Sequence, residues 1–144
     1  MQNELRLAAM NLLARREHSR RELQQKLQRR FGAADELSSV LDALTGEGLQ
    51  SDRRFAESFL RQRLERGYGP LRVRQEMRER GLDEAAIAAA EAALEPDWDE
   101  LAEQVYRRRF SGEPVADARE RARRARFLQA RGFQHQSIRC LLDG

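Results

Sequence analysis

The sequence is poor in the features that mark secreted and membrane proteins. Its 144 residues include a single cysteine, Cys140, so no intramolecular disulfide can form, and this lone thiol in an apolar run is expected to be an inert core residue. No segment approaches the ~20 apolar residues that span a bilayer, and the N-terminus lacks the long apolar core of a signal peptide. A cytoplasmic protein that does not bind membranes is therefore expected.

Motifs for catalysis and cofactor binding are also lacking. The two histidines, His18 and His135, fall in expected turns, and neither has a second histidine or cysteine at metal-ligand spacing. There is no glycine-rich phosphate loop, no Gly-x-Ser-x-Gly and no Cys/His pair with a supporting acid. The acids between positions 95 and 100 fit the capped start of a helix better than a cation site. The sequence thus predicts a protein that is not an enzyme and uses no metal or cofactor.

Aromatic residues are scarce and lysine occurs once, at Lys26, whereas charged residues make up 35% of the chain. With aromatic residues at 6%, the core is expected to be thin and aliphatic. The formal net charge is +3, and almost all the basic side chains are arginines. Arginine forms paired hydrogen bonds with phosphate and carboxylate groups that lysine does not form. The base composition of the coding DNA would produce the same bias, so the arginines alone do not identify a ligand.

A basic helix pair in the middle of the chain is the clearest structural pattern. Between positions 52 and 82, apolar residues recur at one-turn spacing, first around Phe55 and then around Val73. The Gly-Tyr-Gly-Pro segment at 67–70 separates the two stretches, because glycine frees the backbone and proline suits the first position of a helix. The sequence therefore predicts a helix, a turn and a second helix.

The flanking segments repeat this plan with a period of roughly fifty residues. Ser19, which begins a Ser-x-x-Glu capping box, corresponds to Gly69, and the segment ERGLDEAAI at 79–87 returns as ARGFQHQSI at 130–138. Three helices per unit and three units predict an all-α fold, an elongated, curved array of three tandem three-helix repeats. The predicted repeats cover residues 1–50, 51–95 and 96–144.

Basic and acidic segments alternate with the same period. Residues 53–80 contain nine arginines and four acids, whereas residues 83–103 contain eight acids and no basic residue. If the third helix of each repeat lies on one side of the array, an acidic surface and a basic surface are separated. Alternatively, the basic and acidic helices neutralise each other where the repeats meet.

Four segments, taken in order, carry a resemblance to a known family. They are HSRRELQQKL at 18–27, GLQSDRRFAESFLRQR at 48–63, GYGPLRVRQEMRERGL at 67–82 and ARFLQARGF at 125–133. With these segments the chain resembles the RecX family of bacterial recombination regulators, which are small, all-helical proteins built of tandem three-helix repeats. Family members often have two acids where this chain has Ser51 and Asp52, so the resemblance assigns no role to an acidic pair there.

The resemblance implies that the protein binds the RecA recombinase filament, lodges in its helical groove and inhibits the ATPase, strand-exchange and coprotease activities of RecA. It would thereby modulate recombinational DNA repair and the SOS response. It also implies weak, sequence-independent affinity for single- or double-stranded DNA. Linked repeats that contact several RecA protomers need no strong individual site.

The residues expected to contact RecA or DNA are all arginines: Arg53, Arg54, Arg61, Arg63, Arg72, Arg74, Arg78, Arg123, Arg124 and Arg126. Nothing in the sequence indicates a two-fold dimer, so a monomer is expected. One alternative is a direct DNA-binding module in which the LRVRQEMR segment reaches base edges. Another is a helical-repeat adaptor for a different protein partner.

Overall fold

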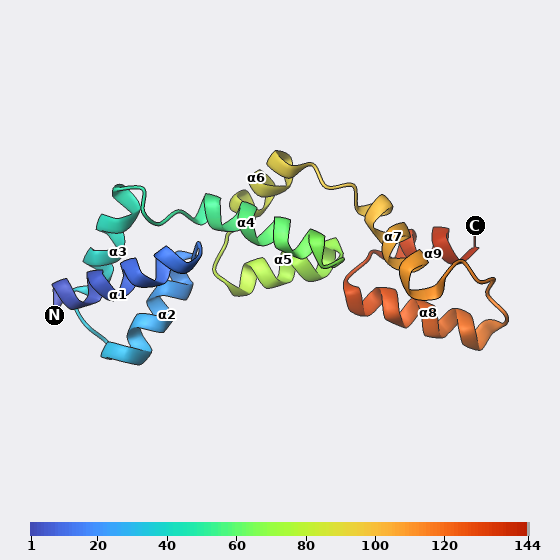
Figure 1. The fold of residues 1–144 in the computed structure, drawn as a ribbon, viewed down its shortest axis with the longest axis horizontal. Helices are drawn as coiled ribbons and strands as arrows, with labels where there is room; N and C mark the ends of the chain where they lie inside the picture. Colours follow the sequence, from blue (N-terminus) through green and yellow to red (C-terminus); the bar gives the residue numbers. More distant parts are fainter. Residues whose placement is uncertain (144) are drawn as a thin grey trace. The chain divides into compact units, whose positions relative to one another are not determined.

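The computed structural model describes residues 1–143, which form nine helices and no strand (Figure 1). The helices are α1 (Gln2–Arg15), α2 (Arg20–Phe31), α3 (Leu37–Gly46), α4 (Asp52–Glu65), α5 (Pro70–Glu79), α6 (Glu84–Leu94), α7 (Trp98–Phe110), α8 (Ala118–Arg131) and α9 (His135–Asp143). The predicted all-α class is confirmed. Within the described residues, none of these helices is long and apolar enough to cross a membrane.

Local sequence signals fix several helix starts. The Ser19 hydroxyl accepts a hydrogen bond from the Glu22 amide (3.1 Å), and the Glu22 carboxylate accepts one from the Ser19 amide (3.1 Å), which completes the predicted capping box before α2. The Asp97 carboxylate accepts a hydrogen bond from the Glu100 amide (3.0 Å) and caps α7. Asp97 therefore serves the helix start, as predicted, whereas Asp99 accepts a hydrogen bond from the Ser137 hydroxyl of α9 (2.7 Å).

Internal contacts divide the chain into two compact units. Unit 1 comprises residues 1–59 and 77–93, and unit 2 comprises residues 60–76 and the described residues from Leu94 onward. The helices α4 and α5 contribute residues to both units.

The first three helices of unit 1 enclose an aliphatic core, as the low aromatic content predicts. The helices α1, α2 and α3 pack against one another. The buried residues of this core are Leu5, Ala8, Ala9, Leu23, Leu27, Leu37, Val40, Leu41 and Leu44.

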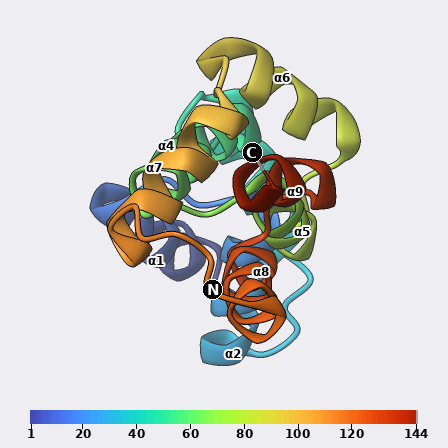
Figure 2. The ribbon, with the colours of Figure 1, turned by 90° about the vertical axis from the view of Figure 1, so that its right-hand side faces the viewer.

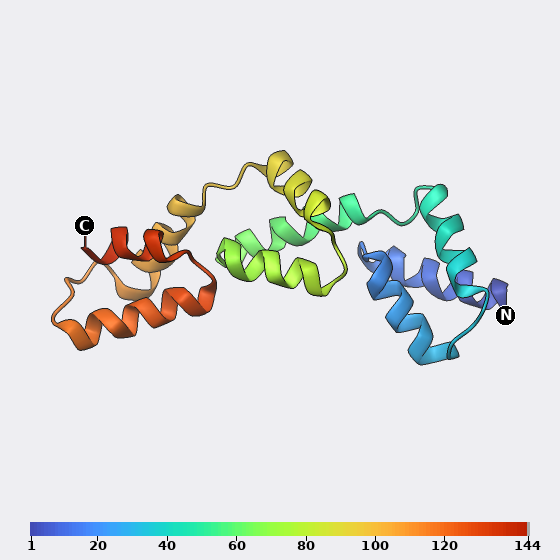
Figure 3. The ribbon, with the colours of Figure 1, turned by 180° about the vertical axis from the view of Figure 1, so that it is seen from behind.

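The last three helices form a second core, in unit 2. In Figures 1 and 2, α7 and α9 lie on the same side of α8, and Figure 3 shows α9 beside α8 from behind. The core residues are Ala102, Val105, Leu128, Phe133 and Ile138. Phe133 and Ile138 belong to the repeated sequence motif, and their counterparts Leu82 and Ile87 are also buried.

Each Arg-Gly turn at the end of a second helix contacts the start of the preceding repeat's second helix. In unit 1, the Ser19 hydroxyl donates a hydrogen bond to the Arg80 carbonyl oxygen (2.7 Å). In unit 2, the Gly69 amide donates one to the Arg131 carbonyl oxygen (2.7 Å). The internal repeat in the sequence therefore corresponds to a repeated joint between successive three-helix groups.

A carboxylate also links α4 to α2 in unit 1. Asp52 accepts hydrogen bonds from the backbone amide of Arg20 (2.9 Å) and from the side-chain amide of Gln50 (2.9 Å). Gln50 is buried and also donates to the His18 carbonyl oxygen (3.3 Å). Asp52 thus has a structural function in this chain: its charge lies at the N-terminal end of α2, where a negative charge is favourable.

The prediction that Cys140 is a buried core residue is wrong, because its side chain is exposed on α9. Ile138 takes the buried position on this helix. Residues two positions apart point about 200° apart around a helix, so burial of Ile138 turns Cys140 toward solvent.

Candidate functional site

The ten arginines predicted to contact a partner are divided between the two units. Unit 1 contains Arg53, Arg54 and Arg78, and unit 2 contains Arg61, Arg63, Arg72, Arg74, Arg123, Arg124 and Arg126. Their environments range from buried to exposed.

In unit 1, two of the three predicted arginines are engaged within the protein. Arg54 forms an ion pair with Glu17 (2.7 Å) and also donates to the Gly48 carbonyl oxygen. Arg78 forms one with Glu84 (2.6 Å). Arg53 has a more distant partner, Glu57, at 3.7 Å, and its side chain is 79% exposed. Arg53 is therefore the most accessible of these three guanidinium groups.

In unit 2, two predicted arginines lie over the Tyr68 ring. Arg63 forms an ion pair with Glu76 (3.0 Å) and lies over the Tyr68 ring at 5.3 Å from its centroid. Arg72 lies over the same ring at 4.1 Å and donates a hydrogen bond to the Ala130 carbonyl oxygen (3.1 Å). Arg74 on the same helix is partly buried. A charge reversal at Arg72 would therefore disturb the joint as well as any ligand contact.

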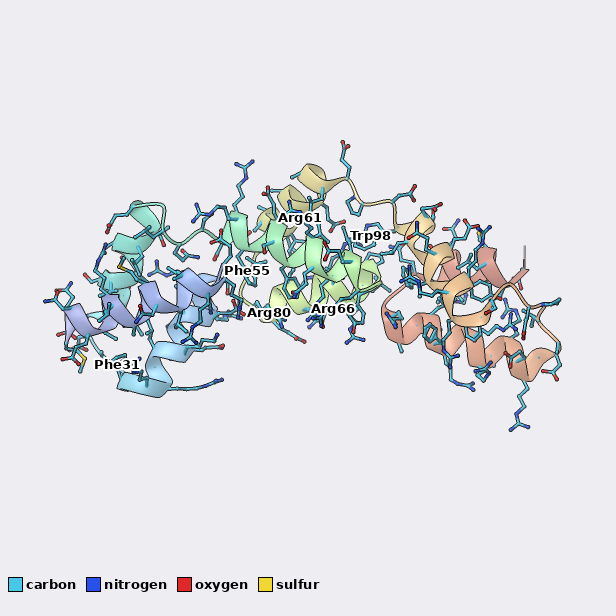
Figure 4. All side chains as sticks on the ribbon, viewed as in Figure 1. Phe31, Phe55, Arg61, Arg66, Arg80 and Trp98 are labelled. Atoms are coloured by element: carbon cyan, nitrogen blue, oxygen red, sulfur yellow. The ribbon has the colours of Figure 1, made fainter. Side chains whose placement is uncertain are left out.

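Arg61, by contrast, is exposed and makes no ion pair with a carboxylate of residues 1–143. Figure 4 labels it on α4. Arg126 on α8 is also exposed and makes no ion pair with a carboxylate of residues 1–143. These two side chains are available to a partner without the loss of an ion pair.

Arg124 is buried inside the third helix group, with 3% of its side chain exposed. Its guanidinium donates to the Tyr106 hydroxyl (2.8 Å), the Glu113 carbonyl oxygen (2.8 Å) and the Glu120 carboxylate (3.0 Å). Hydrogen bonds from Arg123 and then Arg124 lower the pKa of Glu120 to about 2. Arg124 therefore positions the loop before α8, and its buried guanidinium is not accessible to a partner.

An arginine-lined pocket in unit 2 was not predicted from the sequence. It lies where the end of α4 meets α7 and α8, and Figure 4 labels one of its residues, Arg66. Its lining residues are Arg66, Gly67, Val105, Arg108, Arg109, Phe127 and Arg131, and we call it the arginine pocket. None of its four arginines makes an ion pair with a carboxylate of the part of the chain that the structure describes.

Aromatic rings and a carbonyl group orient two of the pocket guanidinium groups. Arg131 donates a hydrogen bond to the Arg66 carbonyl oxygen (2.8 Å) and lies over the Phe127 ring at 5.3 Å from its centroid. Arg109 lies over the same ring at 5.5 Å. The sequence signals were the arginine run at 107–109 and the Arg-Gly pairs that begin at Arg66 and Arg131. These segments are too far apart in sequence for a pattern to bring them together.

The acidic third helices neutralise part of the basic charge. Asp42 of α3 pairs with Arg20 of α2 (2.7 Å), as Glu84 of α6 pairs with Arg78. Such exposed pairs contribute little to stability, about 0–1 kcal/mol each. Neutralisation is incomplete, because Arg61 and the four pocket arginines have no such partner among residues 1–143.

His18 is a turn residue, as predicted, but a buried one. Its Nδ1 lies 3.0 Å from the Arg16 carbonyl oxygen, and its Nε2 lies 3.0 Å from the Lys26 ammonium. A neutral ring that donates from Nδ1 and accepts at Nε2 satisfies both contacts. Burial, followed by the nearby positive charge of Arg16 and Lys26, lowers the pKa of His18.

The chain matches three family models along its length. They describe the first three-helix domain of RecX at residues 6–37, the second at 51–90 and the third at 95–142. Two similar curated proteins are both named Regulatory protein RecX. The one from Pseudomonas entomophila is 48% identical over 141 residues, which cover 97% of this chain and 90% of the relative. The one from Chromohalobacter salexigens is 50% identical over 132 residues, which cover 91% of this chain and 86% of the relative.

Two solved structures share the fold. A crystal structure of regulatory protein RecX superposes with a TM-score of 0.83 over 99% of this chain and 73% of that chain, at 22% identity. The crystal structure of RecX from Lactobacillus salivarius has a TM-score of 0.79 over 99% and 96%, also at 22% identity. The nine-helix arrangement of three three-helix domains is thus a known one.

Proposed function

Because the chain belongs to the RecX family of regulatory proteins, we propose that it binds the RecA nucleoprotein filament and inhibits the ATPase, strand-exchange and coprotease activities of RecA. In this proposal it acts as a non-enzymatic, monomeric regulator in the cytoplasm, and so modulates recombinational DNA repair and the SOS response. Its successive three-helix repeats contact several RecA protomers and block addition of the next protomer or favour loss of those present.

The observation that best supports this proposal is the set of exposed arginines whose charge the protein does not neutralise. Arg61 and Arg126 are the predicted residues of this kind, and within residues 1–143 neither has a carboxylate partner. An acidic protein surface or a phosphate group binds such guanidinium groups through paired, charge-assisted hydrogen bonds. Several weak contacts on linked repeats raise the overall affinity, because each repeat holds the next at a high effective concentration.

Inhibition of DNA-dependent ATP hydrolysis by RecA tests this function. The wild-type chain should lower the hydrolysis rate in proportion to the amount added. Arg61→Glu should require roughly tenfold more protein for the same inhibition, since one charge-assisted hydrogen bond contributes about 1.5–3 kcal/mol. Arg139→Glu is the matched control, because Arg139 is an exposed residue of α9 without a carboxylate partner among residues 1–143. Inhibition by Arg61→Glu at wild-type concentrations would remove this surface from the mechanism.

Direct reading of a DNA sequence has less support than contact with phosphates. The candidate recognition segment lies on α5, where Arg72 is engaged with Ala130 and Arg78 with Glu84. Side chains held in this way are not free to follow base edges in a groove. We therefore propose that any affinity for single- or double-stranded DNA is weak, independent of sequence and based on phosphate contacts.

A further inference from the structure

The arginine pocket has an excess of positive charge that its helical surroundings do not explain. Three helices end beside it: α4 at Glu65, α7 at Phe110 and α8 at Arg131. The C-terminal end of a helix has a partial charge of roughly −0.5, which favours a nearby arginine. Three such ends amount to roughly −1.5, against the four positive charges of the pocket arginines. A net charge of roughly +2.5 therefore remains.

The pocket is also prepared to receive an anion. Arg131 is held by the Arg66 carbonyl oxygen and by Phe127, and Arg109 is held against the same ring. Phe127 is itself fixed by an edge contact with Phe110, at 5.6 Å between ring centroids. Because these guanidinium groups are already oriented, the arginine side chains lose little additional conformational entropy when a ligand binds.

Size and charge together indicate the class of ligand. The pocket volume is about 200 Å³, which is smaller than the roughly 300–1,000 Å³ of pockets that enclose a whole drug-sized ligand. It has room for phosphate groups, with the remainder of a larger molecule outside. One phosphodiester has a single negative charge and would leave most of the positive charge unbalanced. A diphosphate or triphosphate group has enough negative charge to balance it.

We propose that the arginine pocket is a binding site for a compact polyphosphate, such as the triphosphate group of a free nucleotide. Four arginines line the pocket, and a guanidinium group carries paired N–H donors that match phosphate oxygens. This ligand site goes beyond filament binding, and its test requires no RecA.

Isothermal titration calorimetry of the full chain with sodium tripolyphosphate, and separately with ATP, tests the proposal. Both probes should bind with one-to-one stoichiometry. Arg108→Ala should weaken binding of each by roughly tenfold, as expected for loss of a charge-assisted hydrogen bond. Arg119→Ala is the matched control, because Arg119 is an exposed arginine of α8 without a carboxylate partner among residues 1–143. It should change binding less than about twofold.

Three outcomes would overturn the proposal. The first is no saturable binding of either probe to the wild-type chain. The second is an equal loss of binding in Arg108→Ala and Arg119→Ala, which would indicate a diffuse effect of net charge. The third is binding of a short oligothymidylate, but not of tripolyphosphate, that Arg108→Ala weakens. That result would indicate that the pocket binds the phosphodiester backbone of single-stranded DNA and not a polyphosphate. Circular dichroism melts of both variants verify that they are folded.

Discussion

Replacing Gly69 with alanine should destabilise the joint between the second and third helix groups. Here two backbone segments touch: the Gly69 amide donates to the Arg131 carbonyl oxygen (2.7 Å), and the Leu71 amide donates to the Gly132 carbonyl oxygen (2.9 Å). A Cβ atom at Gly69 would lie 2.5 Å from the Gly132 carbonyl carbon, whereas ordinary van der Waals contact begins at about 3.4 Å. The two segments must move apart to admit the methyl group.

The expected cost follows from these two hydrogen bonds. Each backbone hydrogen bond contributes about 1 kcal/mol net, so loss of both lowers the free energy of unfolding by about 2 kcal/mol. Alanine also restricts the unfolded chain, which offsets the loss by about 0.4–1 kcal/mol. The net effect is a destabilisation of at least about 1 kcal/mol, which lowers the melting temperature by roughly 3–5 °C.

Thermal melts followed by circular dichroism measure this effect, with Gly46→Ala as the control. Gly46 ends α3, and nothing lies within 4 Å of a Cβ atom added there. Alanine at this position should leave stability unchanged or raise it by roughly 0.5–1 kcal/mol. Hydrogen exchange of the Leu71 amide provides a local readout, since Gly69→Ala should accelerate it. A Gly69→Ala variant as stable as Gly46→Ala, with Leu71 still protected, would refute the described contact.

Two further predictions concern buried polar groups. Arg124→Met should lower the melting temperature by several degrees, because the Tyr106 hydroxyl and the Glu113 carbonyl oxygen lose a buried hydrogen-bond partner. Arg126→Met is the control and should change the melting temperature by about one degree or less. Equal effects of the two substitutions would contradict the burial of Arg124. The pKa of His18 is lowered in the folded state, so below the ordinary value of 6.5 the unfolded state binds more protons than the folded state. The stability that neutral, buried His18 contributes is therefore present above pH 6.5 and is lost as the pH falls through the lower folded pKa. His18→Gln should flatten the decline in melting temperature between about pH 6.5 and 5, and an NMR titration that finds an ordinary or raised pKa for His18 would exclude this reasoning.

The sequence predicts those parts of the fold that depend on local patterns. The Ser19 capping box, the start of α5 at Pro70 and the burial of both Arg-Gly-apolar motifs follow from spacing over a few residues. Contacts between distant segments leave no such pattern. Nothing near Gly69 in the sequence indicates that its amide donates to the Arg131 carbonyl oxygen. This close backbone contact is the reason why glycine is needed at that position.

The candidate site was harder to predict, because arginines look alike in a sequence. Arg123 and Arg124 are neighbours, yet one is exposed and the other is buried. A usable signal was present: Arg124 lies four residues before buried Leu128 and so shares the inner face of α8. For Arg54 no local signal exists, since its partner Glu17 is 37 residues away. The charge available to a ligand is therefore set by tertiary contacts.

The central claim, that this chain binds the RecA filament, is tested most directly by co-sedimentation. The wild-type chain is mixed at moderate salt with RecA filaments preformed on single-stranded DNA, and the pellet is compared with that from the same DNA without RecA. The chain should appear in the filament pellet in amounts that saturate as it is added. If it pellets no more with filaments than with DNA alone, RecA is not its partner, and a helical adaptor for another protein becomes the better account.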